Sequence, residues 1–503
     1  MGIRTKRTKS WVKNILGYCI VLLCFIGVAL FAPQLEEDAS YGIWTMLPPI
    51  CIFAFILLTK KILEGFFWTS LLAVFMRFRW NILQGFIDQI FENVTNWDNW
   101  WVIYLFLLGG AITYLFKISG AGTFFARWIA KRIKSKKAAL FITSLLGWPL
   151  CVDDYMSGLV LGNVMSPLLD EYGVPREMTA YVIRASVTAP ACLLPIGCWG
   201  IYVGAVFDMW DLNIVEGYAT GFGYYLAKVL PWLFFPFAVM LVCWLVIFGV
   251  IPMFGKMKRA YQRVADGGSV YPPKEIHVVE GEVAEEEEHE EAPEPRKRVN
   301  LSHFIIPIVA IFTFGYIFEW DMAYGISWGL LVSFLYYCIT GVFTTDDAKN
   351  VVTDGFGYMS QMCIMMGLGL VLCNNLDAMG FVDFVVSAVE GFVTPALLPF
   401  LIFFAFSCTE ILVTFNYTLY LIAMPIVVAL AQGCGANVGM CIGALVSTGV
   451  FGYCLAFSSD GGMIACGACG NIDIYEQNTS QYVYMLIAWA LAAVAYLALG
   501  FIF

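Results

Sequence analysis

The sequence predicts an all-α polytopic membrane protein with about eleven transmembrane helices and two re-entrant hairpins. Of its 503 residues, 60% are hydrophobic and only 13% are charged, whereas a soluble domain carries about 25% charged residues. Aromatic residues make up 16% of the chain, and many Trp and Tyr stand near the ends of apolar runs, as in interfacial belts. A pair of acids, Asp153 and Asp154, also stands in the middle of a long apolar field.

The first residues predict a span that stands outside the rest of the fold. Residues 1–13 are basic and precede an apolar run over 11–31, which is too long for the apolar part of a signal peptide. Basic residues favour the cytoplasmic side, so residues 1–40 are expected to form an extra N-terminal span with its start inside. Further spans are predicted over 41–59, 62–78 and 99–117, with an interfacial segment over 80–97 outside and a basic amphipathic run over 126–137 inside.

The first hairpin is predicted over 138–169. Residues 138–152 and 155–169 carry no charge, and charged residues flank both outer ends. As a helix, each 15-residue arm is ~22 Å long, which is short of the ~30 Å hydrocarbon core. A cytoplasmic loop between two spans is the alternative, but neither arm is long enough to cross. The tip, with Pro149 and the two aspartates, is therefore expected near the membrane midplane, where ionised side chains are costly and usually functional.

A broken span and a charged linker complete the first half. The span predicted over 178–206 contains Pro190 and Pro195, which interrupt a helix and free backbone carbonyls. Another span follows over 223–253. Residues 254–300 combine basic residues with the acidic run 285–288, a composition typical of a solvated, disordered cytoplasmic linker.

The second half repeats this order. Spans are predicted over 301–319, 324–342 and 356–373, followed by an interfacial segment over 380–391 and a second hairpin over 394–432. A span over 437–465 is interrupted at 457–462, and the last span covers 481–503. This topology places the C-terminus outside, and of the 28 Lys and Arg it leaves only Arg77, Arg79 and Lys228 outside, in agreement with the positive-inside rule.

The two halves are expected to be inverted repeats. Residues 192–200 correspond to 454–462 and Pro167 corresponds to Pro425, and the fourth span and its counterpart cross in opposite directions. The chain thus divides into residues 1–40, a first repeat over 41–253, the linker 254–300 and a second repeat over 301–503. Inverted repeats with broken helices that meet at the midplane are typical of secondary transporters.

The candidate cation site joins the acids of both halves. Asp153, Asp154, Glu410 and Asp460 are the acids deep in the apolar segments, and Asp154 and Asp460 are expected to ligate Na⁺. Ser459, Thr409 and Asn416 offer neutral oxygens for the same site. The three His residues lie in or beside the linker, so a buried carboxylate must carry any coupled proton, and neighbouring acids can raise one another's pKa enough for this.

Arg184 is the single deep cation of the sequence, and two roles stay open for it. It is expected either to pair with Asp153 or Asp154, or to hold a substrate carboxylate bidentately. Ser186 and Thr188, close by in the same span, are the other candidate substrate residues. Taken singly, each hydroxyl is more often a satisfied packing residue.

These residues resemble the NhaC-type Na⁺/H⁺ antiporter family of the ion transporter superfamily. The first-half match lies within 99–210 and the second within 356–490. The resemblance implies a homodimer that works by an elevator mechanism, with cations bound at the hairpin tips. An acid usually stands in the family where Arg184 stands here, and Glu410 replaces a Ser/Gly-rich tip. The matching residues are Asp153, Asp154, Tyr155, Gly162, Val164, Met165, Pro167, Leu168, Asp170, Arg176, Glu177, Ala180, Tyr181, Pro195, Ile196, Trp199 and Gly200, and then Gly452, Ser459, Asp460, Cys469, Ile472 and Asp473.

The predicted function is a sodium-coupled secondary transporter of the cytoplasmic (inner) membrane, similar to Na⁺/H⁺ antiporters. The alternative is Na⁺- or H⁺-coupled transport of a small carboxylate or amino acid anchored by Arg184. A channel has no need of paired inverted hairpins, and the Gly-x-Gly-Asp context of an intramembrane aspartyl protease is absent, so no enzyme is expected. Expected partners are Na⁺, H⁺ and lipid. No cofactor is expected, and no nucleic acid either, because much of the net charge of −10 comes from one acidic loop.

Overall fold

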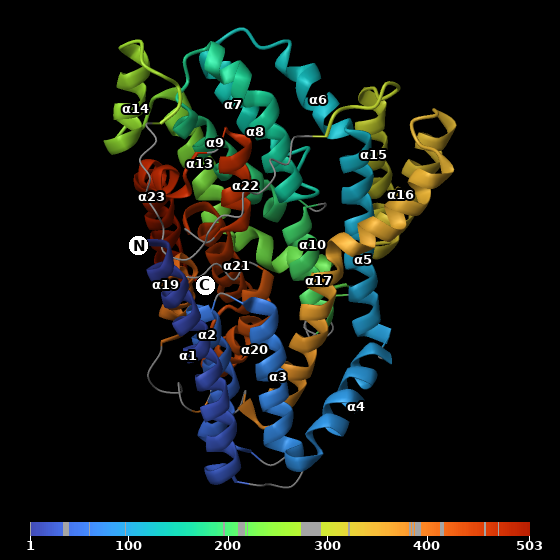
Figure 1. The fold of residues 1–503 in the computed structure, drawn as a ribbon, viewed down its shortest axis with the longest axis vertical. Coiled ribbons are helices and arrows are strands. Elements are labelled where there is room, and N and C mark those ends of the chain that lie inside the picture. Colours follow the sequence, from blue (N-terminus) through green and yellow to red (C-terminus); the bar gives the residue numbers. More distant parts are fainter. Residues whose placement is uncertain are drawn as a thin grey trace.

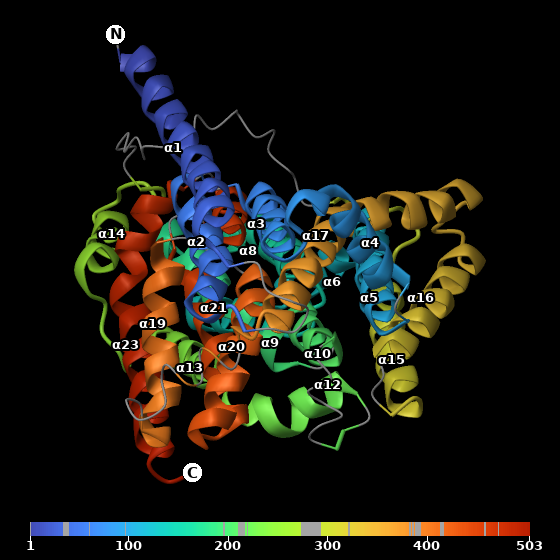
Figure 2. The same cartoon turned by 90° about the horizontal axis from the view of Figure 1, so that it is seen from below.

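The computed structural model is helical throughout the residues it describes, and no strand occurs there. Its helices form a central group flanked at one edge by α15 and α16 and at the opposite edge by α14 and α23 (Figures 1 and 2). The described residues are 2–33, 40–59, 61–95, 97–194, 197–209, 217–218, 220–272, 293–319, 322–381, 384, 387, 394–412, 417–456, 459–470 and 472–503.

The N-terminal helices follow the predicted order closely. The span expected over 62–78 is α3 with those bounds, and the segment predicted to be interfacial contains the amphipathic helix α4, whose Leu83, Ile87 and Phe91 form an exposed apolar stripe. The elements of this part of the chain are α1 (Gly2–Phe31), η1 (Gly42–Met46), α2 (Leu47–Thr59), α3 (Ile62–Phe78), η2 (Arg79–Asn81), α4 (Ile82–Thr95), α5 (Trp97–Ser119) and α6 (Ala121–Ala130).

Residues 136–171 fold into an antiparallel pair of short helices, α7 (Lys136–Leu146) and α8 (Asp154–Glu171). Lys136 Nζ donates to the Gly173 carbonyl over 3.0 Å, so the start of α7 and the end of α8 lie together. The Ser135 side chain caps α7 by accepting from Ala138 N. The turn needs a glycine at 147, because a Cβ there would lie 1.8 Å from the Ser186 carbonyl oxygen. The tip of this helical hairpin thus presses directly on the next helix.

Two buried helices form the centre, and each is followed by a break and a second short helix. Every residue of α9 (Arg176–Leu193) is buried, as are all residues of α21 (Val438–Leu455) after the first. Helices that are buried on all sides form the interior of a protein and not its surface. The breaks fall where the interrupted spans were expected, before α10 (Cys198–Met209) and before α22 (Asp460–Ala468).

Helix starts in the two halves recur at a nearly constant spacing. Three pairs of helices begin 262 positions apart and the fourth begins 263 positions apart. This spacing is the offset at which residues 192–200 and 454–462 correspond in sequence. The pairs are α7 with α19 (Leu398–Leu412), α8 with α20 (Tyr417–Cys434), α9 with α21, and α10 with α22. Residues 413–416, at the tip of the second predicted hairpin, lie outside the described residues.

The remaining helices enclose this centre. Helix α17 is longer than its predicted span and packs along α5, whereas α13 packs against α23. The α23 helix begins at Ile474, seven positions before the span predicted over 481–503. The elements are α12 (Gly221–Tyr224), η3 (Tyr225–Val229), η4 (Leu230–Trp232), α13 (Phe234–Phe248), α14 (Gly255–Ala265), α15 (Leu301–Ile317), α16 (Met322–Ile339), α17 (Thr345–Ala378), η5 (Pro395–Leu397) and α23 (Ile474–Gly500).

Four described segments are long and apolar enough to cross a membrane, and a fifth qualifies if the bent pair 221–232 and 234–248 is one span. The four are Lys13–Phe31, Arg176–Asp208, Val438–Leu455 and Ile474–Gly500. Apart from the span predicted over 62–78, the other predicted spans overlap apolar helices of 10–17 residues. The count of eleven spans stays a prediction.

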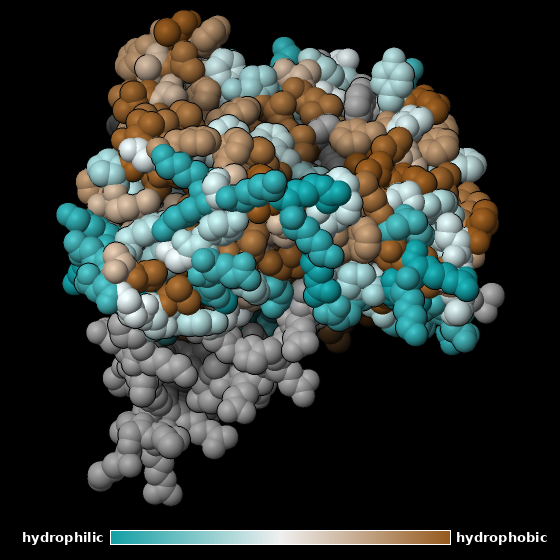
Figure 3. Space-filling model, turned by 90° about the horizontal axis from the view of Figure 1, so that it is seen from above, coloured by the Kyte–Doolittle hydropathy of each residue, from teal (hydrophilic) through white to brown (hydrophobic). Residues whose placement is uncertain are grey.

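The predicted disordered linker is wrong at both of its ends, which are docked. Arg263 of α14 forms a bidentate pair with Glu177, both contacts being 2.9 Å. At the other end Arg296 forms a bidentate pair with Asp347, both contacts being 2.7 Å, and holds the pKa of that carboxyl well below its usual range. These ion pairs hold both ends of the linker against the helices, and composition alone does not predict such contacts. Figure 3, in which the molecule of Figure 1 is seen from above, shows hydrophilic residues in a band across this face, with hydrophobic residues along the upper side of the band.

Candidate functional site

The two aspartates of the hairpin tip stand at the start of α8, and they have different roles. Asp153 is the N-cap, and its carboxylate accepts from Met156 N over 2.7 Å. Asp154 is the first residue of the helix. A helix N-terminus carries partial positive charge and favours a carboxylate. Both side chains are at most 3% exposed, so the start of α8 presents two buried acids to different neighbours.

Asp154 faces the start of α10. Its carboxylate accepts from the indole Nε1 of Trp199 over 2.9 Å, and Cys198 Sγ donates to it over 3.7 Å. Asp153 lies instead beside Thr113 and Lys117 of α5. Consecutive residues on a helix point about 100° apart. Asp154 is therefore the aspartate that faces the break between α9 and α10.

Arg184 lies in the middle of α9 and is fully buried. Its Nη1 donates to Asn478 Oδ1 over 2.5 Å and its Nη2 donates to the Tyr453 carbonyl over 2.9 Å. Its Nε has no partner among the described atoms. No carboxylate of a described side chain lies within ion-pair distance of the guanidinium, so the pair with Asp153 or Asp154 that the sequence left open does not form here.

The first turn of α22 packs directly on this guanidinium. Ser459 caps α22 by accepting from Gly462 N over 3.1 Å, and its hydroxyl donates to the Tyr453 carbonyl over 2.9 Å. A Cβ on Gly462 would lie 2.5 Å from Arg184 Nη2, and one on Gly461 would lie 2.0 Å from the Tyr453 ring. Glycines at both positions let a positive helix end and a guanidinium approach each other. Such an end is a ready anion site.

The side chain of Asp460, the first residue of α22, lies outside the described residues, as does Asn416. Among the described residues no group of three His, Cys, Asp or Glu side chains could hold a metal ion. The predicted Na⁺ ligation by Asp154 and Asp460 therefore stays a prediction.

The second half contributes one buried acid near this centre. Glu410 of α19 is fully buried, and a Cβ on Gly452 of α21 would lie 2.3 Å from Glu410 Oε2. The carboxylate thus packs on the α21 backbone, one residue before Tyr453. Thr409 is turned to its own helix and donates to the Ala405 carbonyl over 3.1 Å.

The two predicted hydroxyls near Arg184 differ. Ser186 is tied to Ser144 of α7 by a hydrogen bond of 2.8 Å, so it fixes the hairpin to α9. Thr188 Oγ1 is buried and lies close to the Tyr453 hydroxyl. Neither Thr188 Oγ1 nor the Tyr453 hydroxyl has a hydrogen-bond partner of normal geometry among the described atoms. Buried polar groups of this kind normally have partners, so Thr188 and Tyr453 are available to a ligand.

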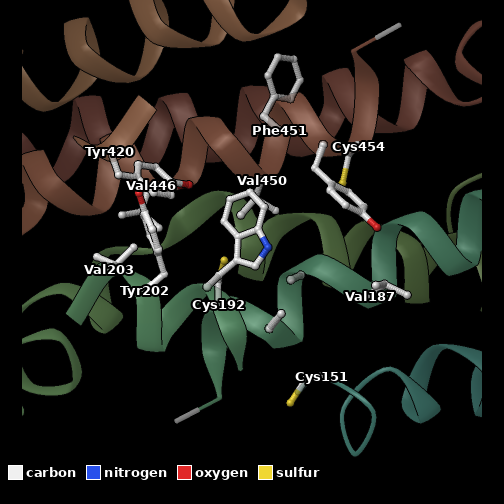
Figure 4. Close-up of a cluster of buried hydrophobic side chains, with 14 of the residues drawn as sticks. Cys151, Val187, Cys192, Tyr202, Val203, Tyr420, Val446, Val450, Phe451 and Cys454 are labelled. Carbon is white, nitrogen blue, oxygen red and sulfur yellow. The ribbon is translucent and has the colours of Figure 1, made fainter. Parts of the chain in front are cut away.

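Aromatic and sulfur-containing side chains fill the space between these polar groups. Figure 4 shows side chains of α9, α10, α20 and α21 together, among them Cys192, Tyr202, Tyr420 and Cys454. The Trp199 ring lies 5.9 Å from that of Tyr420 and 6.4 Å from that of Tyr453. Because Trp199 binds Asp154 and Tyr453 binds Arg184, this cluster joins the acidic and basic parts of the site.

Three buried carboxamides at the start of α23 were not predicted from the sequence. Gln477, Asn478 and Gln481 are at most 1% exposed. Gln477 Nε2 donates to Gln481 Oε1 over 2.9 Å, and Gln481 Nε2 donates to the Cys454 carbonyl over 2.6 Å. A polar stretch before an apolar run resembles a loop. A signal for the start of a helix was nevertheless present in the sequence, because Asp473 is followed three residues later by Glu476. Asp473 does cap α23.

A cleft of the described chain lies away from this centre. It has a volume of about 650 Å³, and no predicted site residue lines it. Its lining comes from the end of α3, from α4 and from α17: Arg77, Phe78, Asn81, Gln84, Gly85, Asp88, Gln89, Glu92, Asn93 and Asn374. The residues around Arg184 and Asp154 are thus separate from the lining of this cleft.

Comparison with known families decides the class of protein. The model of the Na⁺/H⁺ antiporter family matches residues 158–501, which include Arg184, Glu410, Asp460 and all of α23. The chain belongs to the Na⁺/H⁺ antiporter family. The resemblance to NhaC-type antiporters is thereby confirmed, and the family together with the apolar helices indicates a multi-pass membrane protein.

Similar proteins agree with this class. An uncharacterized protein of Haemophilus influenzae is 27% identical over 33% of each chain, and the putative amino acid transporter YuiF of Bacillus subtilis is 26% identical over 46% of each. The matches thus span less than half the length of these relatives. Two solved structures share the fold across nearly the whole chain: the antimetabolite efflux pump MtrF of Neisseria gonorrhoeae (TM-score 0.54, 10% identity, 98% and 97% covered) and the YdaH transporter of Alcanivorax borkumensis (TM-score 0.60, 13% identity, 97% and 98% covered).

Proposed function

We propose that this antiporter-family protein couples the flow of Na⁺ or H⁺ to the transport of a small carboxylate, and that Arg184 holds the carboxylate. The observation that carries the proposal is the fully buried Arg184 guanidinium, with no described carboxylate within ion-pair distance. A guanidinium cannot be deprotonated in a protein. Its charge therefore has to be balanced by an anion.

The surroundings of Arg184 favour an anion that arrives from outside the protein. The N-terminal turn of α22 adds partial positive charge at Gly462. Arg184 Nε has no hydrogen-bond partner among the described atoms, and the Thr188 and Tyr453 hydroxyls, which lie close to each other, have none of normal geometry there. A carboxylate has two acceptor oxygens and suits a guanidinium in a fork-to-fork pair. These groups together match the needs of one small carboxylate.

The acids supply the coupling in this proposal. Asp154 lies at a helix N-terminus and is joined to the Arg184 region through Trp199 and Tyr453. It would bind the cation, together with Asp460, Ser459, Thr409 and Asn416 from the second half, while Glu410 or Asp153 would carry a proton. Oxygen ligands of these kinds suit a hard cation. The recurring helix spacing of 262 supports assembly of this site from two inverted repeats, 41–253 and 301–503.

The two hairpins are the elements that would move in the proposed transport cycle. The helical hairpin at 138–169, with its Gly147 contact on α9, and the predicted hairpin at 394–432 would enter the membrane without crossing it. An elevator movement of a homodimer in the cytoplasmic membrane, with the N-terminus inside and the C-terminus outside, is part of the proposal. The relative YuiF, a putative amino acid transporter, makes amino acids the first carboxylates to test.

Na⁺/H⁺ exchange without an organic substrate is the second candidate. Two adjacent buried aspartates at the start of α8 favour it, because neighbouring acids can raise one another's pKa. In that case Asp460 is the permanent partner of Arg184.

The test is ligand-induced thermal stabilisation of the purified protein across a panel of small carboxylates and amino acids, with and without Na⁺. We expect at least one carboxylate to raise the unfolding temperature of the wild type in a Na⁺- or pH-dependent manner, and Arg184→Gln to abolish this response. Ions alone shifting the unfolding temperature, with no effect of any carboxylate, would support exchange. Flux of the identified carboxylate in proteoliposomes, driven by a Na⁺ or pH gradient, then separates transport from binding.

A further inference from the structure

Three buried carboxamides at the start of α23 stand next to Arg184. Gln477, Asn478 and Gln481 are at most 1% exposed. Buried polar side chains normally satisfy their hydrogen bonds, but here Gln477 Oε1 and Asn478 Nδ2 have no partner among the described atoms. The cluster is thus incompletely satisfied at the point where it contacts the guanidinium.

The orientation of Asn478 follows from its neighbour. A guanidinium only donates hydrogen bonds, so the oxygen end of the Asn478 amide faces Arg184 Nη1, at 2.5 Å. Gln481 Nε2 approaches the same oxygen at 3.4 Å. The Nδ2 end then points where no described acceptor receives it. A buried donor left unsatisfied is unfavourable. The Asn478 amide thus accepts a hydrogen bond from Arg184 while its own Nδ2 donor stays without a partner among the described atoms.

An amide oxygen on a guanidinium occupies the position that a carboxylate oxygen takes in a bidentate pair. We propose that Asn478 is an internal stand-in for the substrate: its amide oxygen occupies Arg184 Nη1 in the absence of substrate and leaves it when a carboxylate binds. The inference rests on the proposed function, because it needs a carboxylate that uses Arg184.

The stand-in gives the site a specificity determinant that lies in α23. An arriving carboxylate replaces a neutral acceptor by a charged one, and charge-assisted hydrogen bonds are roughly twice as strong as neutral ones. The displaced amide can then offer its free Nδ2 hydrogens to the substrate or to Gln481. Neutral amides and alcohols make no such gain over Asn478, so they are rejected. Asn478 thus makes the site selective for ligands that carry a negative charge.

The inference predicts opposite effects for two substitutions at one position. Asn478→Ala removes the competing oxygen, so carboxylate binding should tighten by about tenfold although the empty protein becomes less stable. Asn478→Asp places a permanent carboxylate on Arg184, so the empty protein should become more stable and carboxylate binding should weaken by more than about tenfold. A residue that only supports the fold would weaken binding in both variants.

A matched control exists in α17. Asn375 is also fully buried and also accepts from an arginine, Arg77 Nη1, over 3.3 Å. Asn375→Ala removes the same kind of contact far from Arg184 in the fold, so it should lower stability and leave carboxylate affinity unchanged.

The experiment is titration of the purified full chain with the carboxylates of the stabilisation panel, following the unfolding temperature of wild type, Asn478→Ala, Asn478→Asp and Asn375→Ala. Tighter binding by Asn478→Ala with loss of binding by Asn478→Asp supports the stand-in. Unchanged or weaker binding by Asn478→Ala, or wild-type affinity in Asn478→Asp, overturns it while leaving the proposed function in place. If neither the wild type nor Asn478→Ala responds to any carboxylate, the proposed function itself fails and the stand-in fails with it.

Discussion

A methyl group on Gly462 tests the contact between α22 and the Arg184 guanidinium. The added Cβ would lie 2.5 Å from Arg184 Nη2 and 2.9 Å from its Cζ, whereas ordinary van der Waals contact begins at 3.4 Å. The guanidinium must therefore move by most of an ångström, or the start of α22 must move away. Either shift stretches the hydrogen bonds from Arg184 to Asn478 and to the Tyr453 carbonyl, now 2.5 and 2.9 Å.

Overpacking of this kind costs about 1–3 kcal/mol of folding free energy. Gly462→Ala should therefore lower the free energy of unfolding by about 1–3 kcal/mol, and it should also weaken carboxylate binding because Arg184 Nη2 is displaced from the start of α22. The assay is a binding titration on the purified protein, followed by gradient-driven uptake in proteoliposomes. Gly109→Ala in α5 is the matched control, because a Cβ there meets nothing within 4 Å, and it should keep wild-type affinity. If Gly462→Ala binds like Gly109→Ala, the guanidinium is not held against α22 as described here.

The remaining predictions concern the acids, the hairpin tip and the linker. Asp154→Asn should abolish cation-driven transport whereas Asp153→Asn should weaken it, and proteoliposome flux would show this; two fully active variants would remove both from the coupling mechanism. Gly147→Ala should lower the free energy of unfolding by about 3 kcal/mol or more, because its Cβ would lie 1.8 Å from a backbone oxygen; an unchanged unfolding temperature would contradict the docked hairpin tip. Arg296 lowers the pKa of Asp347 in the folded protein, so this pair stabilises the protein above the ordinary aspartate pKa of about 4 and the stabilisation is lost as the pH falls towards the folded pKa. Asp347→Asn should therefore lower the unfolding temperature at pH 7 and flatten its decline in acid, and equal pH profiles for the two proteins would exclude the contribution.

The sequence was sufficient for the class of protein and for much of the helix order. Long apolar runs and the isolated acids predict spans and breaks directly, and the breaks before α10 and α22 lie where they were expected. The docked ends of the linker were missed because Arg263 and Arg296 form ion pairs with residues far away in sequence. Such pairs leave no local pattern.

The functional site was predicted only in part, because contacts between residues far apart in the sequence leave no local pattern. Charge in an apolar field identifies Asp154 and Arg184, but it cannot say what each side chain faces. The Trp199 contact of Asp154 and the Asn478 contact of Arg184 are set by the packing of α8, α9, α10 and α23. Asn478 itself was missed because a neutral amide in a polar stretch carries no signal of burial.

The replacement of Arg184 by glutamine tests the central claim most directly. Purified Arg184→Gln and Arg184→Gln/Asp460→Asn would be titrated with Na⁺ and with the carboxylate that stabilises the wild type. If Arg184 anchors the substrate, the single variant loses carboxylate binding by more than about a hundredfold and keeps its affinity for Na⁺, and the second substitution restores nothing. If the double variant recovers the stability that the single variant loses, and no carboxylate binds to the wild type, Arg184 is the permanent partner of Asp460 and the protein exchanges cations alone.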